Sequence, residues 1–276
     1  MNETMIQKII HYCWFGGKPL PELAQKCIES WKKYCPEYEI KRWDETNFDL
    51  NYNDYVREAY EAKKWAFVTD VVRLFALVTY GGIYMDTDVE VIKPLDKLLN
   101  CEAVFGFESD KWISTGFMAC KKEQKIFTEL LNDYGGTHFE TSGGFFDMTT
   151  NVERVTNFFM KRGLIANNSM QTIDEIVFLP KEYLCPKDPT TQKINITEHT
   201  LTIHHFDGSW MNDEEKLSLE LRVRYQKFMP ESVAIYIATF IAAAKMNGIK
   251  ETINRLLPWI KKKVITILSK DNSNTM

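Results

Sequence analysis

Residues 65–94 read WAFVTDVVRLFALVTYGGIYMDTDVEVIKP, and this stretch decides the fold. Its apolar residues first recur at helical spacing, and Gly81-Gly82 supplies the left-handed turn that ends a helix. The apolar run Ile83–Met85 then predicts a short buried strand that leads directly into Asp86-Thr87-Asp88. Since ligands of open α/β sheets lie beyond the carboxyl ends of the strands, this pattern predicts a ligand-binding edge.

The two aspartates of this stretch are separated by one residue. In an extended segment Asp86 and Asp88 project from one face and aim their oxygens at one point, while Thr87 points away. Asp70 and Arg73 are spaced i, i+3 and share one face of the predicted helix. We expect these four charged residues to converge. The alternative for Asp70 and Arg73 is an ordinary intrahelical ion pair, which contributes only about 0.3–0.5 kcal/mol.

Composition limits the classes of function. The chain has 276 residues, 45% hydrophobic and 26% charged, enough for one substantial core with an appendage. A net charge of −4 argues against nucleic-acid binding by overall electrostatics. The six cysteines form no CxxC pair and no zinc-spaced group, so we expect them to be reduced and mostly buried, as in a cytosolic protein. No export signal and no membrane-spanning segment are evident.

The N-terminal region predicts the opening of a nucleotide-binding βαβ unit, with a strand over 6–14, a glycine turn and a helix over 21–34. GxGxxG and Walker lysine motifs are absent, so a metal ion is the obvious substitute for holding phosphate. Trp14, at the strand end, is either a platform for a nucleobase or a core residue. Further strands are expected at 39–43, 89–92, 103–107, 113–119, 176–180 and 201–204, and helices at 122–132 and 151–162.

A late strand ends in His204-His205. A lone histidine is usually structural, but two histidines followed by Ser209 and Trp210 favour a role with a metal or phosphate. Adjacent residues of a strand face opposite ways, so we expect one ligand and one supporting residue. Two carboxylates suit Mg²⁺ or Mn²⁺, and an added imidazole favours Mn²⁺.

From Asp213 the pattern is helical, so we divide the chain into a domain of residues 1–212 and a C-terminal helical extension of residues 213–276. Leu217, Leu221, Tyr225 and Phe228 form one apolar stripe, and residues 232–246 predict a second helix. Residues 249–268 carry another apolar stripe with a basic polar side. This basic amphipathic helix either docks on the main domain or lies on an anionic membrane surface, and the tail 271–276 is expected to be disordered.

Three blocks resemble the DXD-containing sugar transferases of glycosyltransferase family 32, which include bacterial capsule and surface-polysaccharide enzymes. They are IIHYCWFGG at 9–17, the block at 65–91 and HHFDGSW at 204–210. The middle block is the most specific, because Asp70, Arg73, Gly81, Gly82, Asp86 and Asp88 fall at the family's spacing. The resemblance implies an α/β GT-A-type, Rossmann-like mixed sheet flanked by helices, with a nucleotide-sugar donor, a divalent metal and retention of anomeric configuration.

The resemblance also implies roles for single residues. The catalytic residues are Asp70, Arg73, Asp86 and Asp88. Contacts to the nucleotide-sugar come from Trp14, Asp70, Arg73, Asp86, Thr87, Ser209 and Trp210, with Trp14 stacking on the base. The metal ligands are Asp86 and Asp88, completed by His204 and His205. Residues 141–144, TSGG, depart from the Gly-Pro turn of many relatives on the acceptor side.

The expected function is therefore a hexosyltransferase that uses UDP-Gal, UDP-GalNAc, UDP-Glc or GDP-Man as donor. Its acceptor is a saccharide, lipid-linked in one version, in capsule, O-antigen or other surface-polysaccharide synthesis. The expected location is the cytoplasm, at the inner face of the cell membrane if the basic helix binds lipid. Two alternatives stay open: an aspartyl phosphatase of the haloacid-dehalogenase type, which IYMDTDVEV superficially matches, and a non-catalytic sugar-nucleotide-binding module.

Overall fold

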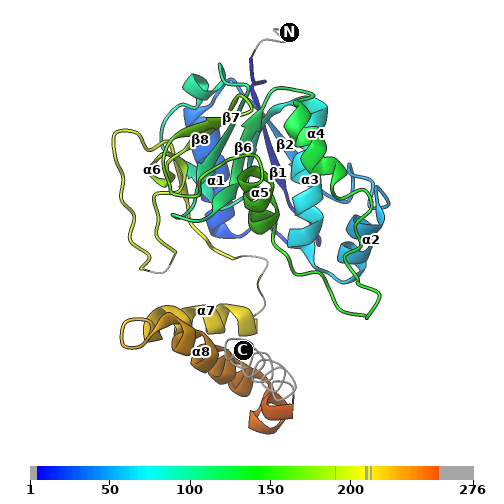
Figure 1. Ribbon diagram of the computed structural model, residues 1–276, viewed down its shortest axis with the longest axis vertical. Helices are drawn as coiled ribbons and strands as arrows, with labels where there is room; N and C mark the ends of the chain where they lie inside the picture. The colour runs from blue at the N-terminus through cyan, green and yellow to red at the C-terminus, as the bar shows by residue number, and fades with distance from the viewer. Residues whose placement is uncertain (1–4, 190, 209–210, 212, 255–276) are drawn as a thin grey trace, which may run out of the picture. The chain divides into compact units, whose positions relative to one another are not determined.

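The computed structural model describes residues 5–189, 191–208, 211 and 213–254. It divides into two compact units, Met1–Asp207 and Gly208–Met276 (Figure 1). The first unit holds the stretch that decides the fold, as helix α3 (Trp65–Tyr80) and strand β3 (Gly82–Met85). Gly81 and Gly82 both have positive φ, and a Cβ on Gly82 would lie 2.5 Å from the Ile9 carbonyl oxygen. The helix-to-strand turn therefore requires glycine.

A seven-stranded mixed sheet forms the centre of the first unit, in the order β2-β1-β3-β6-β5-β8-β7. Strands β1, β2, β3, β5 and β8 run in one direction, and β6 and β7 run against their neighbours. The predicted mixed α/β sheet is confirmed. The remaining strands of this sheet are β1 (Ile9–Cys13), β2 (Glu39–Trp43), β5 (Ala103–Phe107), β6 (Ile113–Cys120), β7 (Gln171–Ile173) and β8 (Ile176–Leu179).

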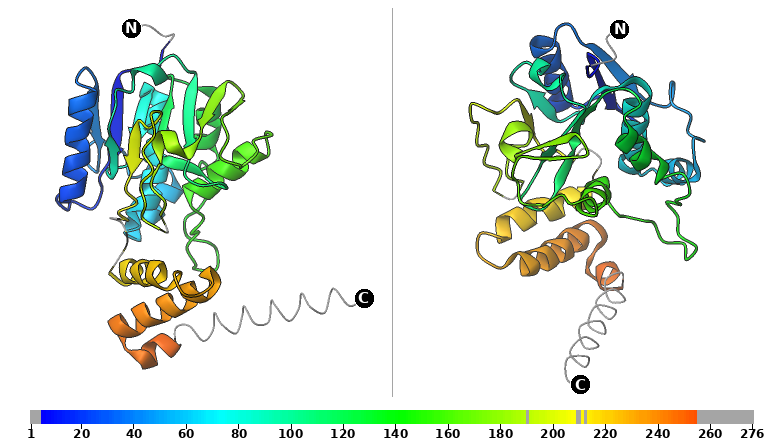
Figure 2. Two further views of the ribbon diagram at one scale, coloured as in Figure 1. Left: turned by 90° about the vertical axis from the view of Figure 1, so that its left-hand side faces the viewer. Right: turned by 45° about the horizontal axis from the view of Figure 1, so that its top comes forward.

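Helices cover both faces of this sheet, and two apolar clusters fill the space beneath them (Figure 2). Alternation along the strands assigns the side chains: Tyr84 faces one cluster, and its neighbours Ile83 and Met85 face the other. The first cluster packs α2 (Asp54–Glu61), α3, α4 (Lys125–Asn132) and α5 (Asn151–Met160), and the second packs α1 (Glu22–Tyr34) and α6 (Lys181–Leu184).

A separate two-stranded sheet pairs β4 (Val89–Val91) with β9 (Thr202–His204) in antiparallel register, Val89 opposite His204. Helix α1 binds β4 through two side chains: Trp31 Nε1 donates to the Val89 carbonyl at 2.7 Å, and the Val91 amide donates to Ser30 Oγ at 2.9 Å. Those contacts fix β4 beside the main sheet.

The predicted helices and strands are found with small shifts at their ends. Helix α4 begins at Lys125 rather than at residue 122, because Gln124 caps it by accepting hydrogen bonds from the Ile126 and Phe127 amides. Short β7, α6 and the 3₁₀ turn Asp96–Leu98 were not predicted. The six cysteines are free, and all except the partly exposed Cys101 are buried, as expected.

The second unit contains α7 (Asp213–Tyr225) packed on α8 (Glu231–Asn247). Buried Ala234, Ala238 and Ala242 recur every four residues and allow close approach of the two helices. Phe228 lies beyond the end of α7 and is 81% exposed, so its predicted place on the α7 stripe is wrong. Most of the predicted basic helix, from residue 255 onward, and the tail lie outside the described residues.

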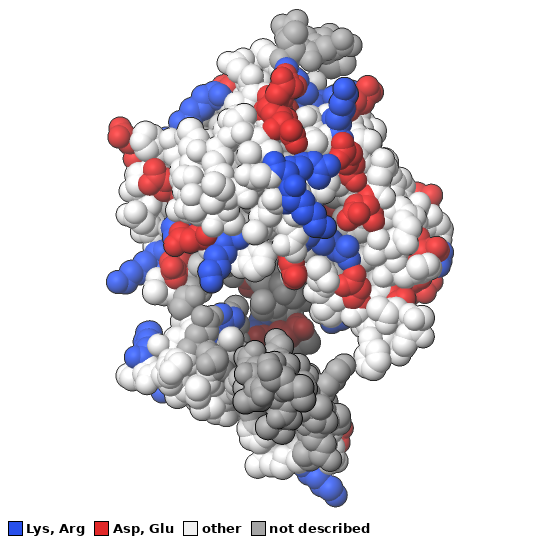
Figure 3. All heavy atoms as spheres, in the orientation of Figure 1, with Lys and Arg blue, Asp and Glu red and all other residues white. Residues whose placement is uncertain are grey.

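Within the described chain, no helix is both long enough and apolar enough to cross a bilayer. On the face of the first unit drawn in Figure 3, Lys and Arg are interspersed with Asp and Glu. That mixture agrees with the small net charge of −4.

Candidate functional site

The two aspartates of the DXD sequence lie at the carboxyl edge of the main sheet. Asp86 follows β3, and its amide donates to the Gly116 carbonyl of β6 at 2.9 Å. The Val89 amide donates to the Asp86 carbonyl at 3.0 Å, which closes a turn around residues 86–89. The carboxylates therefore converge through a turn, and the expectation of an extended segment with alternating side chains is wrong at this point.

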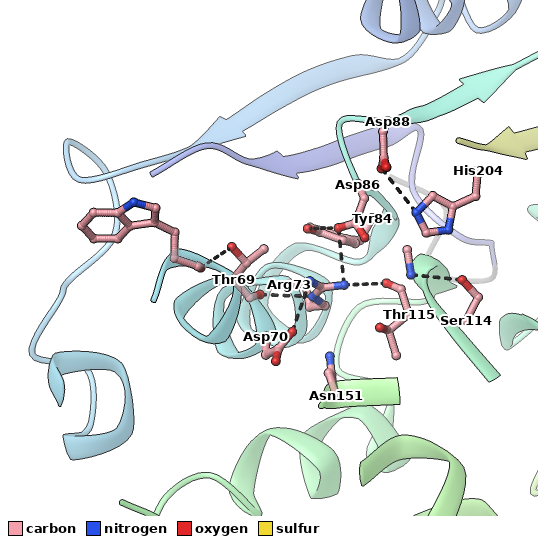
Figure 4. Close-up of polar contacts among 12 residues, drawn as sticks. Thr69, Asp70, Arg73, Tyr84, Asp86, Asp88, Ser114, Thr115, Asn151 and His204 are labelled. Atoms are coloured by element: carbon pink, nitrogen blue, oxygen red, sulfur yellow. Dashed lines mark hydrogen bonds and ion pairs between the residues drawn. The ribbon is translucent and has the colours of Figure 1, made fainter. Parts of the chain in front are cut away.

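His204 completes a group of three possible metal ligands. It ends β9, opposite Val89 of β4, so its imidazole comes to the aspartates. One ligand atom each from Asp86, Asp88 and His204 lies within 4.8 Å of the others, and His204 Nε2 is 3.3 Å from Asp88 Oδ1 (Figure 4). Two carboxylate oxygens and one imidazole nitrogen form a donor set that fits Mn²⁺ or Mg²⁺ and leaves coordination positions for phosphate oxygens.

The electrostatics of this group depend on the close contact of Asp88 with His204. Burial opposes ionisation of both, but their mutual attraction outweighs it, so the pKa of Asp88 falls to about 2 and that of His204 rises well above its ordinary value. In the metal-free protein, a proton on His204 thus balances the Asp88 charge. A metal ion would displace that proton, since a ligating histidine must be neutral.

His205 lies apart from this group, which corrects its inclusion among the metal ligands. Its Nε2 is 2.9 Å from Glu90 Oε2, and its amide donates to the Asp88 carbonyl at 2.9 Å. Strand alternation sends the two histidines to opposite sides. Among the described residues, His205 therefore supports the backbone of the Asp88 turn and does not reach the carboxylates.

Arg73 joins the helix to the carboxylates. Its guanidinium lies 3.2 Å from Asp70 Oδ1 and 3.4 Å from Asp86 Oδ1, and Nη1 donates to the Thr115 carbonyl at 2.8 Å (Figure 4). The Tyr84 hydroxyl also donates to Asp86 Oδ1, at 2.8 Å. Arg73 is therefore more than a partner in an intrahelical pair: it is buried and fixes the orientation of Asp86.

Asp70 is buried behind this arginine, only 7% exposed. Burial raises the pKa of its carboxyl to about 7, with Asp86 adding to the rise and Arg73 opposing it. The Asn151 amide at the start of α5 also donates to it. Asp70 thus holds α3 to the first turn of α5 as well as to Arg73.

Of the other residues predicted to contact the donor, the structure describes Trp14 and Thr87. Trp14 is partly exposed at the end of β1, and its Nε1 donates to the Lys18 carbonyl at 2.5 Å. The indole also packs on the second apolar cluster, so it belongs partly to the core, and its role as a platform for a nucleobase stays a prediction. Thr87 is buried within the DXD turn. Ser209 and Trp210 lie outside the described residues.

Sequence reasoning missed several residues around His204. A Cβ on Gly116 would lie 2.9 Å from His204 Cε1 and 3.1 Å from Asp86 Oδ2, so only glycine leaves room. Cys185 Sγ is 3.5 Å from His204 Nδ1, and the Phe206 ring stacks on the imidazole with centroids 4.1 Å apart. Phe206 has φ of +53°, a strained conformation typical of functional sites. Only HHFDGSW hinted at Phe206; no local pattern identified the other two.

Comparison with known proteins assigns the central part of the chain. Residues 21–105 match the family described as glycosyltransferase sugar-binding region containing DXD motif. This part of the chain is similar to DXD-containing glycosyltransferases. This region includes Asp70, Arg73, Asp86 and Asp88, so the match agrees with the resemblance to DXD-containing glycosyltransferases over the central part of the chain. The match also favours a glycosyltransferase over the aspartyl phosphatase.

Curated relatives share part of the chain. It is 33% identical over 140 residues to "Inositol phosphoceramide mannosyltransferase 3" of Schizosaccharomyces pombe, covering 48% of this chain and 38% of that protein. It is 24% identical over 165 residues to "Subversion of eukaryotic traffic protein A" of Legionella pneumophila, covering 48% of this chain and 25% of that protein. The chain thus spans less than half the length of either relative.

Two solved structures are similar at low sequence identity. "PaToxG Glycosyltransferase" is 20% identical with a TM-score of 0.40, covering 46% of this chain and 59% of that one. A glycosyltransferase "involved in the glycosylation of the major capsid of PBCV-1" is 14% identical with a TM-score of 0.41, covering 83% of this chain and 98% of that one.

Proposed function

We propose that the chain is a metal-dependent glycosyltransferase that moves a sugar from a nucleotide-sugar to a saccharide acceptor. One observation carries the proposal: Asp86, Asp88 and His204 bring three ligand atoms within 4.8 Å of one another, and both aspartates belong to a DXD sugar-binding region. The residues fit a divalent ion in number, type and spacing. We take residues 1–212 as a GT-A-type catalytic domain and residues 213–276 as an extension.

Each residue of the site has a separate task in this proposal. A bound divalent ion supplies charge neutralisation for a leaving diphosphate. Arg73, buried between Asp70 and Asp86, is assigned to orienting the donor hydroxyls. Trp14 offers its exposed ring to the nucleobase. Ser209 and Trp210, which follow the histidines in sequence, are assigned to the leaving phosphate.

We extend the proposal to the stereochemistry of transfer, the donor, the metal ion and the location in the cell. We propose transfer with retention of anomeric configuration, from UDP-Gal, UDP-GalNAc, UDP-Glc or GDP-Man, and the name of the S. pombe relative keeps mannose among the candidates. Mn²⁺ is preferred over Mg²⁺ because an imidazole joins the carboxylates. A cytoplasmic enzyme acting on a saccharide, free or lipid-linked, in capsule, O-antigen or other surface-polysaccharide synthesis fits this chemistry.

A thermal-shift panel of nucleoside diphosphates with and without Mn²⁺ tests the function. Ligand binding raises the melting temperature by mass action, so one nucleobase should stabilise the protein only when Mn²⁺ is present. Asp88→Asn should abolish this shift and the Mn²⁺-stimulated hydrolysis of the matching sugar nucleotide, with its ligand-free melting temperature unchanged. Asp133→Asn, at an exposed aspartate after α4, is the matched control.

Three results are informative. A manganese-dependent shift that Asp88→Asn removes supports the proposal. Nucleotide binding without any dependence on Mn²⁺ favours the non-catalytic binding module instead. Unchanged hydrolysis in Asp88→Asn refutes the role of this carboxylate.

A further inference from the structure

A third carboxylate lies at the same edge of the sheet as the DXD aspartates. Strands β3 and β5 run in the same direction on either side of the antiparallel β6, so their carboxyl ends meet at one edge. Asp86 directly follows β3, and Glu108 directly follows β5. The Glu108 amide donates to the Trp112 carbonyl at 2.9 Å, just before β6, so its backbone is fixed.

Strand alternation sends the Glu108 side chain toward His204. Phe105 and Phe107 face the first apolar cluster, whereas a Cβ on Gly106 would lie 2.8 Å from Leu184 of α6, on the opposite face. Glu108 follows Gly106 by two residues and shares that face. The charges of His204 and Asp86 act on its carboxyl, which agrees with this direction: burial raises the pKa of Glu108 to about 7, Asp86 adds to the rise, and His204 opposes it.

The Glu108 carboxylate lacks a partner in the part of the chain that the structure describes: no hydrogen bond or ion pair to it is found there. It also lies outside the group of metal ligands, which contains only Asp86, Asp88 and His204 among the described residues. The Glu108 side chain is partly exposed, so its carboxylate is accessible to a molecule that enters the site. Because it lies at the same edge as the candidate ligands without joining them, a molecule bound beside the metal can donate hydrogen bonds to it.

The order of strands indicates which part of that molecule reaches Glu108. Along the edge, Trp14 follows β1, Asp86 follows β3 and Glu108 follows β5, in the sheet order β1-β3-β6-β5. If the nucleobase lies on Trp14 and the diphosphate at Asp86, the group attached to the diphosphate extends toward β5. We propose that the Glu108 carboxylate accepts hydrogen bonds from hydroxyl groups of the transferred sugar. This inference rests on the proposed function and deepens it.

The experiment compares a nucleoside diphosphate with its sugar nucleotide in the full chain. Dissociation constants of UDP, UDP-Glc and UDP-Gal, or of GDP and GDP-Man, are measured with Mn²⁺ in wild type, Glu108→Gln and Glu108→Ala. Removing one hydrogen bond to a charged group should weaken sugar-nucleotide binding by about tenfold or more. Binding of the bare diphosphate should change by less than about twofold, which also shows that the variant is folded. Asp110→Asn, exposed two residues further on, is the matched control.

The outcomes separate this inference from the function on which it rests. Selective loss of sugar-nucleotide binding, larger in Glu108→Ala than in Glu108→Gln, supports the assignment. Equal weakening of both ligands in folded variants overturns it, because Glu108 would then act through the metal group. Unchanged binding of both ligands also overturns it. If wild type binds no diphosphate with Mn²⁺, the proposed function itself fails and the sugar contact fails with it.

Discussion

At the scale of a single residue, Gly116 sets the space available to the candidate metal ligands. It lies in β6 directly beside Asp86 and His204, and its φ is not positive, so an alanine meets no backbone strain there. The nearest obstacles to a side chain are the His204 imidazole and the Asp86 carboxylate. Substitution therefore probes the ligand group with little effect on the fold.

We expect Gly116→Ala to reduce Mn²⁺-dependent nucleotide binding by about tenfold or more, since a Cβ 2.9 Å from His204 Cε1 must displace the ring. The measurement is the affinity for the diphosphate that stabilises wild type. Gly136→Ala is the matched control, because a Cβ there meets nothing within 4 Å. Equal affinity in Gly116→Ala and wild type would falsify the crowding argument.

The raised pKa of Asp70 makes the stability of the folded protein depend on pH. In the folded, metal-free protein the pKa of Asp70 is about 7, whereas the pKa of an aspartate in an unfolded chain is about 3.9. Between these values the folded state keeps a proton that the unfolded state has released, so the free energy of unfolding falls as pH rises, by at most about 1.4 kcal/mol per pH unit for one group. Glu108 contributes with the same sign.

Urea unfolding with a chelator present, between pH 4 and pH 7, measures this slope. Asp70→Asn cannot titrate, so its slope should be smaller than that of wild type. A slope that is unchanged by the substitution would show that Asp70 is not the group responsible.

At the scale of secondary structure elements, local pattern predicted most of what forms. The ranges of β2 and β5 match the prediction, and α1 buries Ala24, Cys27, Ile28 and Trp31 at helical spacing. The two glycines at 81–82, which readily adopt positive φ, correctly predicted the turn before the strand that leads to the DXD sequence. Periodicity and turn residues act over a few positions, so the sequence contains them directly.

Contacts between distant parts of the chain could not be predicted in the same way. The pairing of β4 with β9, which brings His204 to Asp88, depends on the packed fold, and so do Cys185 behind the imidazole and Glu108 at the end of β5. The turn that brings Asp86 and Asp88 together depends on a hydrogen bond that no residue pattern specifies. The motif therefore predicted the two aspartates, whereas only the packed fold shows that His204, and not His205, lies beside them.

Helix α1 supports β4, and one hydrogen bond tests that support. Ser30→Ala removes the acceptor for the Val91 amide, and an unsatisfied amide costs about 1–3 kcal/mol. We expect the free energy of unfolding to fall by about that amount and Mn²⁺-dependent nucleotide binding to weaken. Lys33→Ala, on the exposed side of the same helix, is the control and should change neither. Full stability in Ser30→Ala would argue against this role for α1.

At the scale of the whole molecule, the chain separates into a unit that holds the site and a second helical unit. Helix α8 exposes apolar side chains, among them Ile235, Ile237 and Phe240, and the sequence after it is basic. Apolar surface next to lysines is typical of segments that bind anionic membranes.

We predict that deleting the residues after Asn247 reduces binding to liposomes that contain anionic lipid, with Mn²⁺-stimulated hydrolysis of the sugar nucleotide retained. Co-sedimentation measures the first quantity and nucleotide release the second. If the shortened chain unfolds, the deleted segment acts by docking on the rest of the protein.

The small sheet of β4 and β9 has a consequence for the proposed binding of a divalent ion. Asp88 directly precedes β4 and His204 ends β9, so an ion bound to both side chains would link the two strands. When that ion leaves with the nucleotide, the link is lost and the paired strands should open more readily. Amide hydrogen exchange should detect this change: the His205 amide should exchange slowly in the manganese-loaded protein and faster after chelation.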